Sequence, residues 1–153
     1  MKISILNEPE YKSWYKNNLC VVYLLDYLGT PSHLRNQGIG SSILKRLESD
    51  LKKHENIEQL HIILESETPL DNENSIENLI RQRRINFYKR NGWVKMYEMA
   101  TCGMRFDTMT FGKIPTELEK VQAYHKQIYG PTRTDVVIPL PKGETAPLPY
   151  WMK

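Results

Sequence analysis

One short segment of the chain has the composition of an anion-binding loop. Its residues are, in order, Arg35, Asn36, Gln37, Gly38, Ile39, Gly40 and Ser41. The segment lies between the expected end of a strand and the start of a helix, where backbone N–H groups lack intrahelical acceptors and the helix dipole is positive. Gly38 and Gly40 let phosphate oxygens approach the main chain, and Arg35 and the Ser41 hydroxyl add donors. This pattern predicts a diphosphate site. The alternative is a tight turn whose glycines serve only the backbone geometry.

Other ligand motifs are missing from the sequence. The loop has neither the Gly-Lys-Ser/Thr ending of a P-loop nor a third glycine at Rossmann spacing. The two cysteines, Cys20 and Cys102, have no Cys or His at metal-ligand spacing, so we expect no metal. The histidines are scattered, and each is expected to be a surface or half-buried imidazole: His33, His54, His61 and His125.

The elements that hold this loop follow from hydrophobic patterning. Residues 20–28 are β-branched and aromatic and predict a largely buried strand. Apolar residues then recur at helical spacing from Gly38 to about His54, and residues 60–64 predict a second strand, covered on both faces. Strand, helix and strand in this order predict a right-handed parallel crossover.

The rest of the chain predicts two further helices and an antiparallel strand pair. A helix over about 75–91 is expected to end at Gly92 as a left-handed C-cap. Residues 93–97 and 104–111 alternate like paired strands, and 116–129 has an amphipathic stripe. Five of the prolines fall in residues 131–153, which we interpret as an extended tail on the surface after a domain of residues 1–130.

Two motifs together resemble the GNAT superfamily of N-acetyltransferases. The stretch from Leu25 to Gly40, Leu-Asp-Tyr-Leu-Gly-Thr-Pro-Ser-His-Leu-Arg-Asn-Gln-Gly-Ile-Gly, is similar to the acetyl-CoA signature Arg/Gln-x-x-Gly-x-Gly/Ala after a buried strand. The stretch from Arg84 to Trp93, Arg-Ile-Asn-Phe-Tyr-Lys-Arg-Asn-Gly-Trp, is similar to a later aromatic-Tyr motif that ends in Gly-Phe/Trp. Both occur in the family's order, and the resemblance covers about residues 20–112.

The resemblance implies an α/β (α+β) fold with a mixed, splayed β-sheet flanked by helices. Acetyl-CoA would be the co-substrate, with its pantetheine arm pairing like an added strand with the backbone of Leu28 and Thr30. Its diphosphate would rest on residues 36–41. The family has more elements before the signature strand than the 19 residues found here. We therefore expect a sheet shortened at its N-terminal side, with at most one strand and one short helix in residues 1–18.

The resemblance also implies direct attack of an amine on the thioester, without a covalent enzyme intermediate. Tyr88 occupies the position of the tyrosine that faces the CoA sulfur, and a phenol can protonate the leaving thiolate. The alternative is that Tyr88 only packs in the core. Asp26 and Glu65, on the two strands that border the expected cleft, are candidates for the base; a paired charge and a solvated strand end are their respective alternatives.

These residues leave two functional classes open. The first is an N-acetyltransferase acting on a small-molecule or peptide amine; the second is a catalytically idle CoA-binding or interaction module. A basic cluster on the helix 75–91 suits the adenosine 3′-phosphate, an acidic partner or simple solvation; it comprises Arg81, Arg83, Arg84, Lys89 and Arg90.

Composition and charge narrow the range of partners. The net charge of +3, from 21 Lys and Arg against 18 Asp and Glu, is too small for a protein that coats nucleic acid. No apolar run approaches the roughly 20 residues of a membrane helix, so we expect a cytoplasmic protein without membrane contact. A shortened sheet leaves an exposed edge and an apolar face, which predicts a homodimer, with the C-terminal tail packing on its own core or on the neighbouring subunit.

Overall fold

The computed structural model describes residues 2–5, 20–53 and 59–152 of the chain. It contains five strands, three α-helices and two short 3-10 helices within these residues. The strands are β1 (Lys2–Ile5), β2 (Cys20–Tyr27), β3 (Gln59–Glu67), β4 (Trp93–Thr101) and β5 (Met104–Phe111). The helices are η1 (Ser32–Leu34), α2 (Ile39–Lys52), α3 (Ile76–Arg90), α4 (Leu118–Tyr129) and η2 (Tyr150–Met152). Most predicted elements are therefore present, with β3 and β4 longer than expected.

The strands form one mixed sheet in the order β1-β2-β3-β5-β4. Strands β2 and β3 are parallel and are joined through α2, which confirms the predicted crossover. The other neighbouring pairs are antiparallel. Strand β1 lies within the N-terminal segment for which we expected at most one strand and one short helix, and the rest of that segment lies outside the described residues. The mixed α/β class inferred from the sequence is confirmed.

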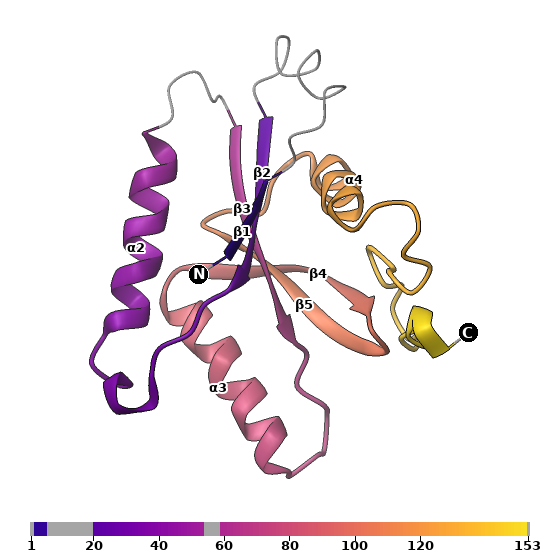
Figure 1. Ribbon diagram of the computed structural model, residues 1–153, viewed down its shortest axis with the longest axis horizontal. Coiled ribbons are helices and arrows are strands. Elements are labelled where there is room, and N and C mark those ends of the chain that lie inside the picture. The colour runs from indigo at the N-terminus through magenta and orange to yellow at the C-terminus, as the bar shows by residue number, and fades with distance from the viewer. Residues whose placement is uncertain (1, 6–19, 54–58, 153) are drawn as a thin grey trace.

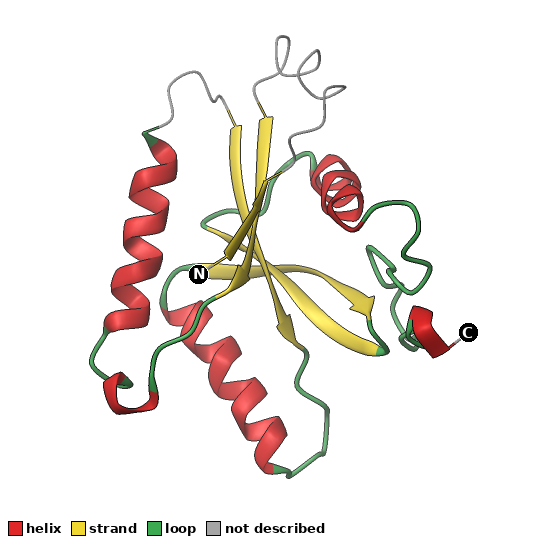
Figure 2. Ribbon diagram, viewed as in Figure 1, coloured by secondary structure: helices red, strands yellow, loops and turns green. Residues whose placement is uncertain are grey.

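Helices cover both faces of the sheet (Figures 1 and 2). Helices α2 and α3 lie on one face and pack over a buried cluster that includes Leu25, Leu44, Leu64 and Ile85. Helix α4 lies on the other face, where Val121 and Tyr124 join a second cluster whose strand residues are Val22, Leu24 and Ile63. Alternate residues of β2 thus enter opposite cores, which explains the continuous apolar character of this strand.

Helices α2 and α3 are joined by a contact that requires glycine. A Cβ atom added to Gly40 would lie 3.0 Å from the Phe87 ring, closer than ordinary packing permits. The start of α2 is therefore fixed against α3 through a residue without a side chain. Helix α3 begins at an N-cap serine, Ser75, whose side-chain oxygen accepts from the backbone N–H of Asn78. The helix is followed by Gly92 at φ 86°, as predicted.

The last segment of the chain lies along β4 (Figure 1). Ala100 and Val137 exchange backbone hydrogen bonds of 3.0 Å, and the Leu140 N–H donates to the Glu98 carbonyl at 2.7 Å. Val136, Ile138 and Leu140 are buried. This part of the tail therefore packs on its own core, which is one of the two arrangements expected from the sequence, and its backbone pairs with the β4 edge of the sheet.

An ion pair fixes the beginning of this segment. The Asp135 side chain is fully buried, and it accepts from Arg133 at 2.9 Å and from the Cys102 backbone N–H at 2.8 Å. Cys102 (φ 53°) and Gly103 (φ 76°) form the left-handed turn between β4 and β5. The segment is therefore held to the tip of this hairpin as well as to the β4 edge.

Within the described residues, no helix is long and apolar enough to span a bilayer.

We predict that Asp135→Asn lowers the free energy of unfolding by about 2 kcal/mol, because it removes a buried, charge-assisted hydrogen-bond acceptor. Chemical denaturation at several pH values measures this loss. Arg133 holds the pKa of Asp135 at about 2, against an ordinary value of 3.8. The stabilisation by the carboxylate is therefore fully present above about pH 4 and is lost as the pH falls through about 2.

The matched control is Asp50→Asn, which breaks an exposed pair with Arg46 of similar length, 2.8 Å. Exposed pairs contribute little, so this change should cost much less stability than Asp135→Asn. Equal losses for the two variants, or a difference between Asp135→Asn and the wild type that does not shrink below pH 4, would contradict the assignment.

Candidate functional site

Strands β2 and β3 stop pairing with each other before either strand ends. Their last register partners are Leu25 and Leu64. Beyond this point β2 continues beside β1 as far as Tyr27, and β3 continues beside β5 as far as Glu67. Figure 1 shows the two strands separating toward their C-terminal ends. We call residues 26–27 of β2 and 65–67 of β3 the strand fork. Backbone groups that face each other across the fork have no strand partner there, as an extended ligand would require.

The predicted anion-binding loop follows β2 directly. Asn36 (φ 63°) and Gly38 (φ 77°) have left-handed backbone conformations, and the first helical bond runs from the Ser42 N–H to the Gly38 carbonyl at 3.0 Å. Within the described residues, the N–H groups of the four residues before Ser42 donate no hydrogen bond: Gly38, Ile39, Gly40 and Ser41. Four unpaired donors at the start of a 14-residue helix form an anion-binding geometry.

The polar side chains of this loop are exposed and partly engaged by the loop itself. The Arg35 Nε lies 3.4 Å from the Thr30 carbonyl, and the Gln37 amide donates to the His33 carbonyl at 3.2 Å. Asn36 is exposed, and Leu28 is half-buried against the core under α2 and α3. The residues that are predicted to bind the diphosphate thus lie together in one loop, on the same side of the molecule as the end of β2.

Tyr88 lies in the core cluster that contains the last paired residues of β2 and β3, Leu25 and Leu64. Its ring makes edge contacts with Phe87 and Trp93, at centroid distances of 5.3 and 6.1 Å. The ring therefore does pack in the core. Its hydroxyl has no acceptor in the part of the chain that the structure describes. Burial raises the pKa of Tyr88, and the charge of Arg84 offsets this only in part, so the phenol keeps its proton at neutral pH.

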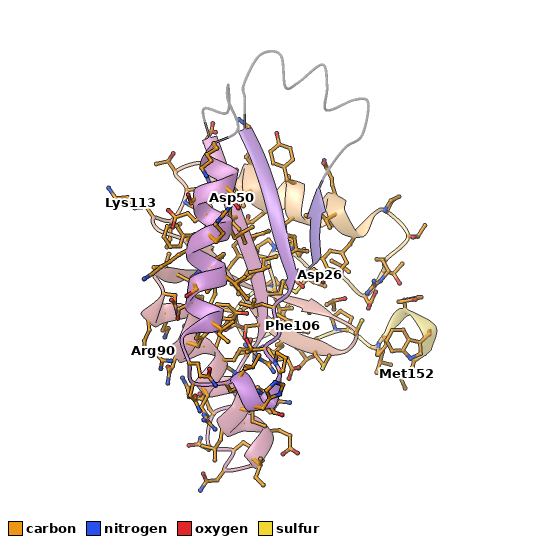
Figure 3. All side chains as sticks on the ribbon, turned by 60° about the vertical axis from the view of Figure 1, so that its left-hand side comes forward. Asp26, Asp50, Arg90, Phe106, Lys113 and Met152 are labelled. Atoms are coloured by element: carbon orange, nitrogen blue, oxygen red, sulfur yellow. The ribbon has the colours of Figure 1, made fainter. Side chains whose placement is uncertain are left out.

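The two candidate carboxylates begin the fork on its two strands. Asp26 follows Leu25, and Glu65 follows Leu64. By strand alternation both side chains share the α4 face with Leu24 and Ile63. Their surroundings differ, because Asp26 is exposed (Figure 3) whereas the Glu65 side chain is only 15% exposed.

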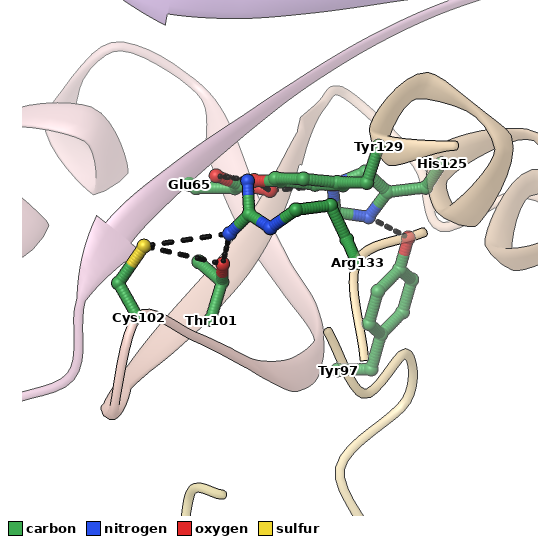
Figure 4. A network of polar contacts seen from close by, with 7 residues as sticks. All are labelled: Glu65, Tyr97, Thr101, Cys102, His125, Tyr129 and Arg133. Atoms are coloured by element: carbon green, nitrogen blue, oxygen red, sulfur yellow. Dashed lines mark hydrogen bonds and ion pairs between the residues drawn. The ribbon is translucent and has the colours of Figure 1, made fainter. Parts of the chain in front are cut away.

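Glu65 is bound by residues that the sequence motifs do not include. The Tyr129 hydroxyl lies 2.6 and 2.7 Å from the two carboxylate oxygens, and His125 Nε2 lies 2.6 Å from Oε1 (Figure 4). His125 is fully buried, and its Nδ1 lies 3.0 Å from the Tyr97 hydroxyl. The expectation of a surface or half-buried imidazole is therefore wrong for His125, because the carboxylate and the phenol bond both ring nitrogens.

The spacing of His125 and Tyr129 was a usable signal. Residues four apart lie on one face of a helix, and Tyr129 already belonged to the predicted apolar stripe of this helix. The partner of this pair, Glu65, lies 60 residues earlier in the chain than His125 and is revealed only by the fold. Of the other histidines, His33 is exposed and His61 is half-buried, as expected, while His54 lies outside the described residues.

Burial and the charge of Glu65 raise the pKa of Tyr129 far above its ordinary value, and the charge of Asp26 adds to this effect. The phenol therefore remains a donor, and Asp26 lies within electrostatic range of the Tyr129–Glu65 contact. The Arg133 guanidinium lies 5.5 Å from the centre of the Tyr129 ring and bonds Thr101 (Figure 4). It also bonds Asp135. The C-terminal segment thus supports the outer side of the Glu65 contacts.

A cavity of about 340 Å³ adjoins the β3 side of the fork. Glu67, the last residue of β3, contributes to its wall, together with Arg81 of α3 and Met104 of the hairpin. Arg81 of the basic cluster is paired with Glu67 at 2.8 Å. The other four members of the cluster are exposed: Arg83, Arg84, Lys89 and Arg90. The cavity volume is at the small end of the range for ligand sites.

Comparison of the chain with protein-family models, with curated proteins and with solved structures finds no match.

Proposed function

We propose that this chain is an acyl-CoA N-acyltransferase of the GNAT type, which transfers an acetyl group from acetyl-CoA to a primary amine. The observation that carries the proposal is the strand fork and the loop that follows it. A parallel strand pair opens at Leu25 and Leu64, and the strand on one side leads into a loop with four N–H donors that have no acceptor among the described residues. An opening for an extended arm beside a site for its diphosphate suits the shape and charge of CoA.

The sheet topology also supports the GNAT assignment. The resemblance implies a mixed sheet that splays open after the signature strand, and the signature in this chain begins within β2. The only parallel pair among the described strands is the one that β2 forms with β3, and it is the pair that separates. The second motif, at residues 84–93, lies on α3 and at the start of β4, so that Tyr88 reaches the same core cluster as Leu25.

The side chains around the fork fit the two halves of the transfer. On the α2 and α3 side, the pantetheine arm would pair with the backbone of Leu28 and Thr30, next to the protonated Tyr88. On the α4 side, Asp26 and Glu65 place negative charge where the acceptor amine gains positive charge. The cavity beside Glu67 gives the remainder of the acceptor a place next to the fork.

The reaction then needs one proton acceptor and one proton donor. The amine nitrogen attacks the thioester carbon, the C–S bond breaks, and the amine proton passes to a carboxylate. Asp26 is the better acceptor, because it is exposed whereas the Glu65 side chain is only 15% exposed. Tyr88 gives its proton to the leaving thiolate and regains one from solvent. Glu65 contributes as a fixed negative charge.

The second candidate function is a CoA-binding module without catalysis. It is favoured by the involvement of Glu65 in internal hydrogen bonds and by the packing of the Tyr88 ring in the core. The two functions share the CoA site and differ in turnover. Release of free thiol from acetyl-CoA, measured over a panel of amino acids, polyamines, aminoglycosides and peptides, separates them.

The first prediction concerns CoA binding. Acetyl-CoA should bind with a micromolar Kd, and Gly38→Val should weaken this affinity at least tenfold, since a side chain at residue 38 shields the N–H donors. Gly38 has φ 77°, and a Cβ atom added to it would have no neighbour within 4 Å, so the substitution strains the backbone without a clash. Isothermal titration calorimetry measures both affinities.

Gly143→Val is the matched control, because Gly143 has φ 86° and equally open surroundings but lies in the C-terminal segment. Both variants should lose a similar stability of about 1–2 kcal/mol. If Gly38→Val binds CoA as the wild type does, or if the wild type gives no binding heat at millimolar CoA, the loop is only a turn.

The second prediction concerns Tyr88. Tyr88→Phe should lower turnover by about 10²-fold with little change in CoA affinity, because it removes the proton donor and keeps the packed ring. Thiol release under saturating acetyl-CoA measures the effect. Tyr124→Phe, a tyrosine of similar burial on the opposite face of the sheet, should keep its turnover. Equal turnover of Tyr88→Phe and the wild type would assign Tyr88 to packing alone.

A further inference from the structure

We propose that Tyr129 and His125 are positioning residues that hold the Glu65 carboxylate fixed at the strand fork, where it faces the acceptor amine. This role rests on the proposed acetyltransferase function and assigns to α4 a part in it. Neither residue needs to touch the substrate, since each acts through Glu65.

The contacts restrict the carboxylate from two directions. Tyr129 bonds both oxygens, and His125 bonds Oε1 from the helical turn before it. His125 is itself held by Tyr97 of β4 through its other ring nitrogen. A side chain of β3 is thus fixed by a helix and by a second strand, so rotation of the Glu65 carboxylate breaks at least one short hydrogen bond.

The hydrogen-bond directions form a consistent set. An ionised carboxylate only accepts, so Tyr129 donates its hydroxyl proton and His125 donates from Nε2. In the neutral imidazole Nδ1 then accepts the proton of Tyr97, and burial raises the pKa of Tyr97 so that this proton is retained. Both carboxylate oxygens thus face fixed donors, which holds the carboxylate in one orientation, as electrostatic stabilisation of an amine requires.

Stability alone gives a weak reason for this cluster. The neighbouring residues on this face are apolar, including Ile63, Val121 and Tyr124. Replacing a buried polar group set by apolar residues of similar size is often neutral or stabilising, so the cluster is not required to complete the core. Hydrogen bonding beside the cluster is also incomplete. Thr108, the cross-strand neighbour of Glu65, is fully buried, and its hydroxyl has no hydrogen-bond partner in the described part of the chain.

The location of the cluster is what connects it with the proposed reaction. Glu65 is the first residue of β3 beyond the last pair with β2. The charged and titratable groups around it are Tyr129 and His125 of α4, Asp26 of β2 and Tyr97 of β4. Arg133 lies behind the Tyr129 ring, with its guanidinium bonded to Asp135. The one ion-pair contact of Glu65 among the described residues is the one with His125.

The test is a double-mutant cycle between residues 65 and 129, with turnover, KM for the acceptor and Kd for CoA measured for each variant. Tyr129→Phe should lower kcat about tenfold with little change in the Kd for CoA, since the carboxylate loses the donor that bonds both of its oxygens. Glu65→Gln, which keeps the shape and removes the charge, should lower kcat at least as much. Because Tyr129 acts through Glu65, the double variant should be no slower than Glu65→Gln alone.

His125 gives a second line of the same test. His125→Gln keeps a donor near the Nε2 position and should retain more turnover than His125→Leu, whereas a packing role predicts the opposite order. Tyr150→Phe, an exposed tyrosine in the C-terminal segment, is the control and should be unchanged. Additive losses in the 65/129 cycle, or a kcat of Tyr129→Phe equal to that of the wild type, would overturn the positioning role. The His125 pair applies if Tyr129→Phe does not fold.

A readout without turnover separates failure of this inference from failure of the proposed function. The ¹³C carboxyl chemical shift of Glu65, measured by NMR at one fixed pH in the intact chain, should differ between the wild type and Tyr129→Phe, because the carboxylate loses a hydrogen-bond donor. Coinciding chemical shifts overturn the positioning role even in an active transferase. A changed chemical shift in a chain that binds acetyl-CoA but acetylates no amine overturns the transferase and, with it, the catalytic use of this cluster.

Discussion

The parallel pairing of β2 and β3 is the constraint on which most of this structure depends. Two parallel neighbours need a crossover connection, and here α2 supplies it on the face that it shares with α3. The same pairing sends the C-terminal ends of both strands in one direction, so the loop after β2 and the chain after β3 begin close to the fork. Because β1 and β5 continue to pair with the outer sides of these strands, β2 and β3 can separate while each remains in the sheet.

The two faces of the sheet at the fork have different chemistry, and strand alternation is the reason. Leu25 and Leu64 turn toward α2 and α3, so the next residues, Asp26 and Glu65, turn toward α4. One face therefore brings an aromatic wall with a protonated phenol to the fork, and the other brings two carboxylates. Under the proposed function, this separation keeps the proton donor for the thiolate apart from the negative charges that receive the amine.

Much of the fold follows from local patterning, whereas the buried polar contacts do not. The run of β-branched residues marks β2, helical spacing marks α2, and a glycine ends α3 at the predicted residue. Strand β3 is longer than the predicted 60–64, because Glu65 and Glu67 are typical of a solvated turn and become strand residues only by pairing with Thr108 and Phe106 of β5. Periodicity has no access to such long-range partners.

The candidate site divides in the same way. The predicted anion-binding loop is contiguous in sequence, so its glycines and its place before a helix are visible without the fold. The contacts of Glu65 come from a helix 60 and 64 residues later. His125 has no recognisable motif around it in the sequence, yet it is fully buried, because its hydrogen-bond partners are brought to it by the fold.

The C-terminal segment links the stability of the fold to the geometry of this site. Arg133 divides its guanidinium between Asp135 and Thr101 and places it beside the Tyr129 ring. Because Asp135 is fully buried and ionised, Arg133 is held in place by a contact whose loss is costly. The Tyr129 ring is therefore fixed on one side by α4 and on the other by a segment that also completes the β4 edge. The C-terminal segment, which is not part of the predicted anion-binding loop, thereby helps to fix the Glu65 carboxylate at the fork.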